Sequence, residues 1–138
     1  MNRFIDAQRE VYECVVSELK FEKKTTHWMW YIFPQLKALG KSKRAIYYGL
    51  ADEAEARLYC NDNILHSRYL ECCEILLNTV ETDPEKIFGC VDAVKLKSSL
   101  TLFYIVDEGN RHIYKRLIDK FFEGQLDQLT TKFLSNNS

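Results

Sequence analysis

Residues 62–80 carry the clearest folding signal in the chain and read DNILHSRYLECCEILLNTV. Asp62 or Asn63 can cap a helix at its start, because short polar side chains accept hydrogen bonds from the free backbone N–H groups there. Apolar residues then recur at spacings of three and four, which places them on one helix face. This stretch is therefore predicted to be an amphipathic helix whose buried face holds Leu65, Tyr69, Cys72, Cys73, Leu76, Leu77 and Val80.

Similar patterns on both sides of this stretch predict further helices. The sequence from Asp83 to Gly89 is typical of a short helical turn, since proline suits the first helical position and glycine suits the end. Longer helices are expected at residues 3–20, from a Ser42 cap to Leu50, at 52–59, at 111–122 and at 127–134. The predicted fold class is mainly α, a compact helical bundle of about six to seven helices.

Two segments fit this interpretation less well. Residues 28–33 (WMWYIF) and 99–106 (SLTLFYIV) are rich in aromatic and β-branched side chains, so short buried strands stay open by propensity. Their helical neighbours favour helices here as well. The polar residues 135–138 are expected to fray at the chain end.

The length and charge of the chain restrict its class. The 138 residues are expected to form one globular domain spanning 1–138, with 46% hydrophobic and 13% aromatic residues. A formal net charge of −1 argues against a protein that coats nucleic acid or an anionic membrane.

The charge is nevertheless divided along the chain. Residues 20–44, the basic block, hold seven basic side chains and one acid, whereas residues 45–85, the acidic block, hold nine acids and two basic side chains. The two blocks could face each other as weak surface pairs. Alternatively, the basic block could frame a cleft for an anion, because clefts focus a field of one sign.

Compartment and cofactors follow from what the chain lacks. Because it has no apolar leader and no run of about 20 apolar residues, a cytoplasmic protein is expected. Its five cysteines are an odd number and are expected to be reduced thiols. Neither a metal nor a cofactor is predicted, because no Cys-x-x-Cys spacing, phosphate-binding glycine loop or dinucleotide-binding glycine motif occurs.

The first segment that could carry chemistry is residues 24–36, KTTHWMWYIFPQL, within the basic block. It contains both tryptophans and His27, whose side chain could act as acid, base or anion ligand, or simply be an inert hydrogen-bonded residue. Pro34 disfavours helical geometry at Phe33, so a helix should end there and leave Gln35 in an exposed connection.

The second segment is residues 88–103, FGCVDAVKLKSSLTLF. In a helix, Asp92, Lys95 and Ser99 would share one face, with Ser98 close by. The lysine could hold a phosphate or carboxylate, or activate a serine. The simpler alternative is an Asp92–Lys95 surface pair, with the serines bonded to their own helix backbone.

At these two segments the sequence resembles the bacterial family called domain of unknown function 1810, some members of which carry the label calpastatin. The resemblance rests on residues 27–36 (HWMWYIFPQL), on Leu39-Gly40-x-Ser42-x-x-Ala45-x-x-Tyr48, on Arg68-x-x-Glu71-Cys72 and on Ile87-Phe88-Gly89-x-x-Asp92-x-x-Lys95-Leu96-x-Ser98-Ser99-x-Thr101-Leu102-Phe103. It spans nearly the whole chain. Leu100, where the family often has methionine, and Phe21-Glu22-Lys23, in place of a glycine-bearing turn, depart from the family pattern.

The resemblance implies a compact, mainly helical domain in the cytoplasm, without an established activity. It also implies that several polar residues belong to the family pattern, which favours their convergence on one site. These residues are His27, Trp30, Gln35, Ser42, Lys95, Ser98, Ser99 and Thr101.

The leading hypothesis is a cleft that binds a small anionic molecule, such as a nucleotide or an ADP-ribose-like ligand, with hydrolytic turnover left open. His27, Lys95 and Ser99 are the candidate catalytic residues. The candidate ligand-binding residues are Lys24, Trp28, Trp30, Gln35, Ser42, Ser98 and Thr101.

A protein-interaction module is the alternative, with the basic and acidic blocks as complementary surfaces. RNA binding ranks third, because basic and aromatic residues interleave only in residues 20–44, so a nucleic acid is not expected as the partner. Neither is a membrane. The chain is expected to be a monomer or a weak homodimer.

Overall fold

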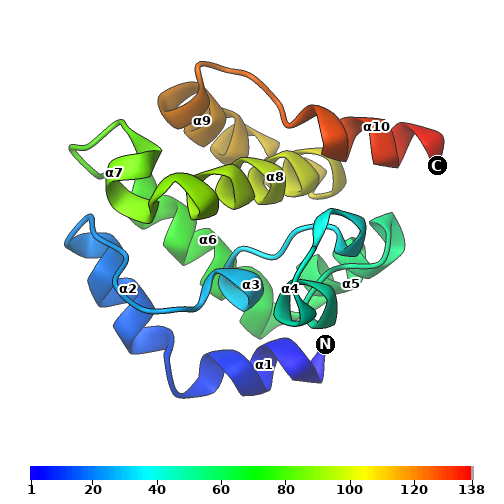
Figure 1. Cartoon of the computed structure of the whole chain (residues 1–138), viewed down its shortest axis with the longest axis horizontal. Coiled ribbons are helices and arrows are strands. Elements are labelled where there is room, and N and C mark those ends of the chain that lie inside the picture. Colours follow the sequence, from blue (N-terminus) through cyan, green and yellow to red (C-terminus); the bar gives the residue numbers. More distant parts are fainter. Residues whose placement is uncertain (138) are drawn as a thin grey trace.

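The computed structural model describes residues 1–137, and none of them forms a strand apart from an isolated bridge between Leu36 and Leu50. Ten α-helices and two short 3-10 helices occur within this range (Figure 1). The mainly helical class is confirmed, whereas the expected number of six to seven helices is wrong. The elements are α1 (Asn2–Arg9), α2 (Tyr12–Lys20), α3 (Met29–Ile32), η1 (Lys37–Leu39), α4 (Lys43–Tyr47), α5 (Glu53–Asn61), α6 (Asn63–Leu77), α7 (Pro84–Phe88), α8 (Cys90–Val106), η2 (Glu108–Asn110), α9 (Arg111–Phe122) and α10 (Gln128–Asn136).

The helix expected at residues 3–20 is divided into α1 and α2, which accounts for part of the difference in number. Gln8 is buried, and its amide donates to the backbone oxygen of Tyr31 at 2.7 Å and to the hydroxyl of Tyr59 at 3.2 Å. These bonds hold α1 against α3 and α5, while α2 packs on α6. One straight helix could not meet both sets of partners, so tertiary packing overrides the local pattern.

The two ambiguous segments are helical, as α3 and as the C-terminal half of α8. Burial within the bundle outweighs their β-propensity. At the chain end, α10 continues two residues beyond the expected limit at Leu134, so Ser135 and Asn136 are helical. Ser138 lies outside the described residues.

Side-chain caps begin helices where the sequence indicates. Ser42 Oγ accepts from the Ala45 N–H at 3.1 Å, and Asp62 rather than Asn63 caps α6. Asp83 caps α7, which ends at Gly89 with a φ of 83°. These bonds satisfy backbone N–H groups that a helix start leaves free, so the expected start signals are confirmed.

Helix α8 is the centre of the bundle (Figure 1). It lies between α9 and α10 on one side and the α1–α5 region on the other, and α6 crosses behind it. At the crossing, the rings of Tyr69 and Phe103 are 4.4 Å apart between centroids. Within residues 1–137, no helix combines the length and apolar character that a membrane span needs.

Glu18 on α2 holds the loop that leads to α3. Glu18 is 7% exposed, and its carboxylate accepts hydrogen bonds from the backbone N–H groups of Thr25 and Thr26, the Thr26 hydroxyl and the Trp28 indole. Burial alone would raise the pKa of Glu18, but these hydrogen bonds, with one from Cys14, lower it to about 2. The ionised carboxylate therefore organises the start of residues 24–36.

Glu18 should make the protein sensitive to acid. Because its folded-state pKa lies below its ordinary value, its stabilisation is present above about pH 4.5 and is lost as the pH falls towards 2. Glu18→Gln should therefore lower the free energy of unfolding by about 2 kcal/mol at pH 6, and by much less at pH 3. Urea unfolding at both pH values measures this difference. Glu13→Gln, an exposed change on the same helix, is the control, and an equal loss at both pH values would contradict the assignment.

Candidate functional site

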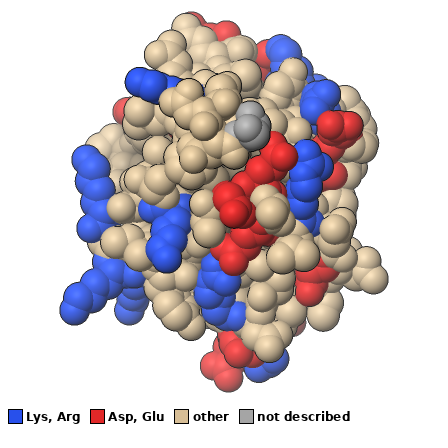
Figure 2. Space-filling model, turned by 90° about the vertical axis from the view of Figure 1, so that its right-hand side faces the viewer, with Lys and Arg blue, Asp and Glu red and all other residues tan. Residues whose placement is uncertain are grey.

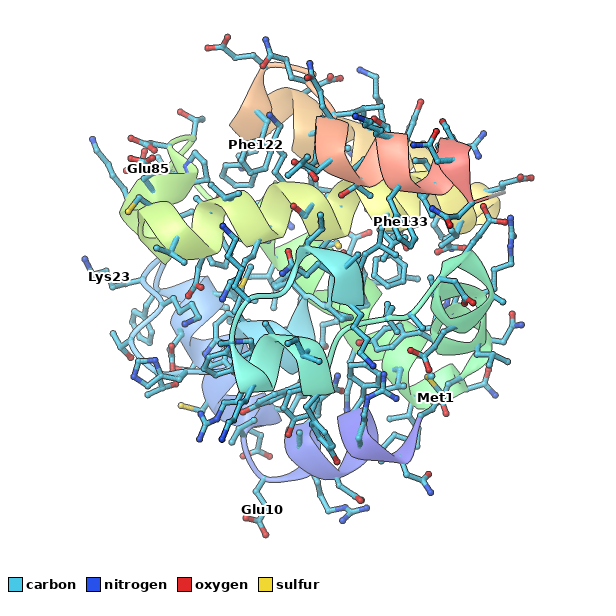
Figure 3. All side chains as sticks on the ribbon, turned by 45° about the vertical axis from the view of Figure 1, so that its right-hand side comes forward. Met1, Glu10, Lys23, Glu85, Phe122 and Phe133 are labelled. Carbon is cyan, nitrogen blue, oxygen red and sulfur yellow. The ribbon has the colours of Figure 1, made fainter. Side chains whose placement is uncertain are left out.

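A pocket of about 410 Å³ lies between the segment 35–45 and the N-terminal half of α8. Figure 3 shows this segment, with η1 and α4, below α8. The pocket has polar groups from Gln35, Lys41, Ser42 and Lys95, and none of its lining residues is acidic. Its apolar wall consists of Leu39, Ala45, Val91 and Val94.

The backbone of this segment is fixed at its two ends. Phe33 leaves helical geometry before Pro34, with φ −120° and ψ 71°, which confirms the expected end of the helix. The Leu50 N–H then donates to the Gln35 oxygen at 2.9 Å, and the Lys37 N–H donates to the Leu50 oxygen at 2.7 Å. The loop therefore closes on itself and holds Gln35 at the pocket.

Gly49 allows this closure. A Cβ atom at position 49 would lie 2.4 Å from the Lys37 Cα atom, which is backbone and cannot move aside. Only glycine permits so close an approach of two backbone segments. The local sequence thus holds η1 and α4 over α8.

Trp30 lies beside two cations from different elements. The guanidinium carbon of Arg44 is 5.2 Å from the Trp30 ring centroid, and the Lys95 ammonium is 5.4 Å from it. Lys95 also lies 3.8 Å from Asp92, the neighbour expected from helical spacing. Trp30 and Lys95, two predicted site residues, therefore come together.

Lys24 has a structural partner instead. Its ammonium forms an ion pair with Asp92 at 2.9 Å and donates to the Thr26 oxygen at 2.6 Å, and the side chain is only 6% exposed. The ammonium also lies 5.0 Å from the ring centroid of Trp28. Lys24 therefore fastens the loop before α3 to the start of α8.

Trp28 and His27, two predicted site residues, lie elsewhere in the structure. Trp28 is buried in the core, with its indole N–H bonded to Glu18 at 3.1 Å. His27 is exposed and lines a separate hollow of about 250 Å³ with Tyr31 and Arg44. Neither residue lines the 410 Å³ pocket, although Arg44 links the His27 hollow to Trp30.

The hydroxyl residues of α8 are buried away from the pocket. Ser99 bonds the Tyr69 hydroxyl at 2.7 Å. Ser98 donates to the Asp127 carboxylate at 3.1 Å, and Thr101 accepts from the Asp127 N–H at 2.9 Å. These bonds attach α6 and the start of α10 to α8. The structure thus does not bring Ser98, Ser99 and Thr101 to Lys95, because each hydroxyl is satisfied inside the bundle.

A second polar cluster was missed by the sequence interpretation. Asp107 at the end of α8 accepts from His66 at 2.8 Å, from Asn110 at 3.1 Å and from the Tyr114 hydroxyl at 2.5 Å. Burial, together with the bond to Asp107, raises the pKa of Tyr114. The four residues are separated by up to 48 positions, and no local spacing could reveal them.

This cluster borders a hollow of about 330 Å³ that also contains Cys60. Burial and the nearby Asp107 charge raise the pKa of the Cys60 thiol to about 12, so the thiolate needed for nucleophilic chemistry is not formed near neutral pH. Across the described part of the chain, no group of three or more His, Cys, Asp or Glu side chains is arranged to hold a metal ion.

Ser99 is therefore expected to stabilise the fold. Ser99→Ala leaves the buried Tyr69 hydroxyl without its partner and should lower the free energy of unfolding by about 1–3 kcal/mol. Tyr69→Phe removes the other partner, and the double variant should lose less than the sum of the two single losses. Urea unfolding of the four proteins measures this, with Ser67→Ala on the exposed surface of α6 as control. Strict additivity would contradict the assigned bond.

Comparisons with known proteins agree on the fold. A solved structure that closely resembles this chain is that of the conserved hypothetical protein Rv1873 from Mycobacterium tuberculosis, with a TM-score of 0.94 and 38% sequence identity. The match covers 97% of this chain and 95% of that one. No curated protein matches the chain.

The family model described as "Protein of unknown function (DUF1810)" matches residues 1–134. This is the family indicated by the motifs at residues 27–36 and 87–103. The match includes the pocket between segment 35–45 and α8. The chain belongs to the DUF1810 family.

Proposed function

We propose that this protein binds a small anionic ligand in the pocket between segment 35–45 and α8. The observation that carries the proposal is the lining itself, which brings two lysines, Lys41 and Lys95, to an apolar wall without any acidic residue. A positive field in a low-dielectric hollow attracts small anions. Ser42 and Gln35 add hydrogen-bonding groups that can orient them.

Neither lysine has to give up a strong ion pair to bind a ligand. Asp92 is 2.9 Å from Lys24 but 3.8 Å from Lys95, so its carboxylate is mainly engaged by Lys24. Lys41 forms no ion pair within residues 1–137. An anionic oxygen of the ligand can therefore pair with the Lys41 and Lys95 ammonium groups, whose charge no nearby carboxylate strongly compensates.

The apolar wall favours a ligand with a flat or apolar body as well as an anionic group. A nucleotide or an ADP-ribose-like molecule has both, and is the class we propose. The proposal is one of binding and includes no hydrolysis, because Ser99 bonds Tyr69 in the core and His27 lies at another hollow. We propose the cytoplasm as the setting and a monomer or weak homodimer as the form.

A protein-interaction surface is the second candidate. Phe21 is 82% exposed and Val80 is 90% exposed. Val80 lies beyond the end of α6 at Leu77, so its expected place on the buried face of that helix is wrong. Glu22, next to Phe21, accepts from the Val80 N–H at 3.1 Å. Exposed apolar groups beside charges are typical of interaction sites. On the opposite side of the molecule from the end of α2, Figure 2 shows acidic side chains gathered near the middle of the face and basic side chains along its left edge. No ion pair within residues 1–137 joins the basic block to the acidic block, although Lys24, Glu53 and Glu55 pair with other residues.

Ligand binding should raise thermal stability. A ligand at 100 times its dissociation constant adds about 2.7 kcal/mol to the free energy of unfolding. A thermal-shift screen with inorganic phosphate, nucleotides, sugar phosphates and NAD fragments should therefore give a concentration-dependent rise in Tm. For Lys95→Gln, the same rise in Tm should need a ligand concentration at least ten times higher, because the variant lacks one of the two lysine charges.

Lys132→Gln on α10 is the matched control, since Lys132 is exposed and does not line the pocket. An equal loss of response in both variants would indicate general charge attraction and contradict the proposed site. Absence of any response at high ligand concentration would favour the interaction surface instead.

A further inference from the structure

Trp30 carries a hydrogen-bond donor without an acceptor. Its Nε1 atom is buried and is the one buried side-chain nitrogen or oxygen that finds no partner among residues 1–137. Buried N–H groups in folded proteins are nearly always paired, because an unpaired one has lost its water without compensation. The other tryptophan follows this rule, since Trp28 donates to Glu18 at 3.1 Å. An acceptor brought by a bound ligand would satisfy the Trp30 donor.

Positive charge surrounds this donor. The Arg44 guanidinium and the Lys95 ammonium both lie within 5.4 Å of the Trp30 ring centroid. Attraction to the ring partly compensates each cation, but two like charges near one indole repel each other. Arg44 forms no hydrogen bond or ion pair through its side chain within the described residues, and Lys95 has only the distant Asp92. Two cations without a close ion-pair partner thus lie beside an indole whose N–H is unpaired.

Arg44 and Lys95 also connect two hollows. Lys95 lines the 410 Å³ pocket, whereas Arg44 lines the hollow that contains His27. Trp30 itself lines neither hollow, but it lies beside one cation from each of them. Because Nε1 is buried, a ligand can reach it only after a neighbouring side chain moves, and the Arg44 side chain is exposed and long enough to do so.

We infer that the Trp30 indole N–H, together with Arg44 and Lys95, binds the phosphate group of the ligand. This inference rests on the proposed function and names the group that is recognised. A phosphate monoester offers three non-bridging oxygens to three donors, whereas a carboxylate offers two, so phosphate is the better match. The role of Trp30 is then to donate a hydrogen bond, not to stack on a base, because cations occupy the space beside its ring.

The two tryptophans provide a direct test. In a ¹⁵N–¹H correlation spectrum the chain gives two indole N–H signals, and Trp30→Phe assigns both by removing one. Titration with AMP and, separately, with inorganic phosphate should move the Trp30 signal downfield and saturate. The Trp28 signal should stay in place, because its N–H is already bonded to Glu18. Sodium acetate and sodium chloride at equal ionic strength are the controls for a carboxylate and for salt alone.

Variants separate the donor from the ring. Trp30→Phe keeps an aromatic ring in the bundle but removes the N–H, and should weaken AMP binding about tenfold in isothermal titration calorimetry. Arg44→Gln should weaken it by a similar factor, and Arg116→Gln on the exposed side of α9 should not change it. Without ligand, Trp30→Phe removes an unsatisfied donor but also part of the ring volume beside two cations, so its urea unfolding curve is recorded to show that the variant is folded under the binding conditions.

The outcomes distinguish this inference from the proposed function. If AMP binds and Lys95→Gln weakens it, but the Trp30 signal does not move and Trp30→Phe binds equally well, the inference is overturned and the pocket remains. If acetate moves the Trp30 signal as strongly as phosphate does, the assignment to phosphate is wrong. If no anion binds at millimolar concentration, the proposed function and the inference both fail.

Discussion

The burial of α8 is the constraint on which the rest of the bundle depends. The C-terminal half of α8 is buried on nearly all sides and must be covered by other elements. Helices α5, α7, α9 and α10 pack against α8, and Tyr69 of α6 contacts Phe103. The buried hydroxyls of α8 must also find partners, because an unpaired polar group in the core costs free energy. Ser99 finds Tyr69 on α6, and Ser98 and Thr101 find Asp127 before α10. These bonds fix which helices cover which side.

The other helices leave part of the N-terminal half of α8 uncovered, and the candidate site lies there. Val91 and Val94 are exposed on this helix and form part of the pocket wall. Segment 35–45 reaches across from the other side of the bundle, held by the Leu36–Leu50 bridge and the close approach at Gly49. A short segment fixed at its ends can hold polar groups over an apolar helix without filling the space between them.

The charges around this region fall into two groups. Glu18, Lys24 and Asp92 are held by internal hydrogen bonds and ion pairs that position the loop before α3. Lys41 and Arg44, on the other side, have no ion-pair partner within the described residues. The acids near the site are therefore largely used in the fold, and the charge left over is positive. A chain with a net charge of −1 can in this way present a cationic site.

Much of the secondary structure could be predicted from the sequence, because it depends on short-range signals. The caps at Ser42 and Asp62, the helix end at Phe33 and the helix over 111–122 all follow from neighbours within a few positions. The same motifs indicated the family. The division of residues 3–20 into two helices could not be predicted in this way, because it depends on bonds from Gln8 to residues far along the chain.

The candidate site, like the secondary structure, could be predicted from the sequence only in part. The sequence supplied the residue types, and Gln35, Ser42 and Lys95 do line one pocket. Only the tertiary structure decided that Trp28 is bonded in the core while the N–H of Trp30 is unpaired, and that Ser99 faces Tyr69 instead of Lys95. Local spacing determines which side chains share a face of a helix. Which face meets the core and which meets a hollow depends on the helices packed against it, and those come from distant parts of the chain.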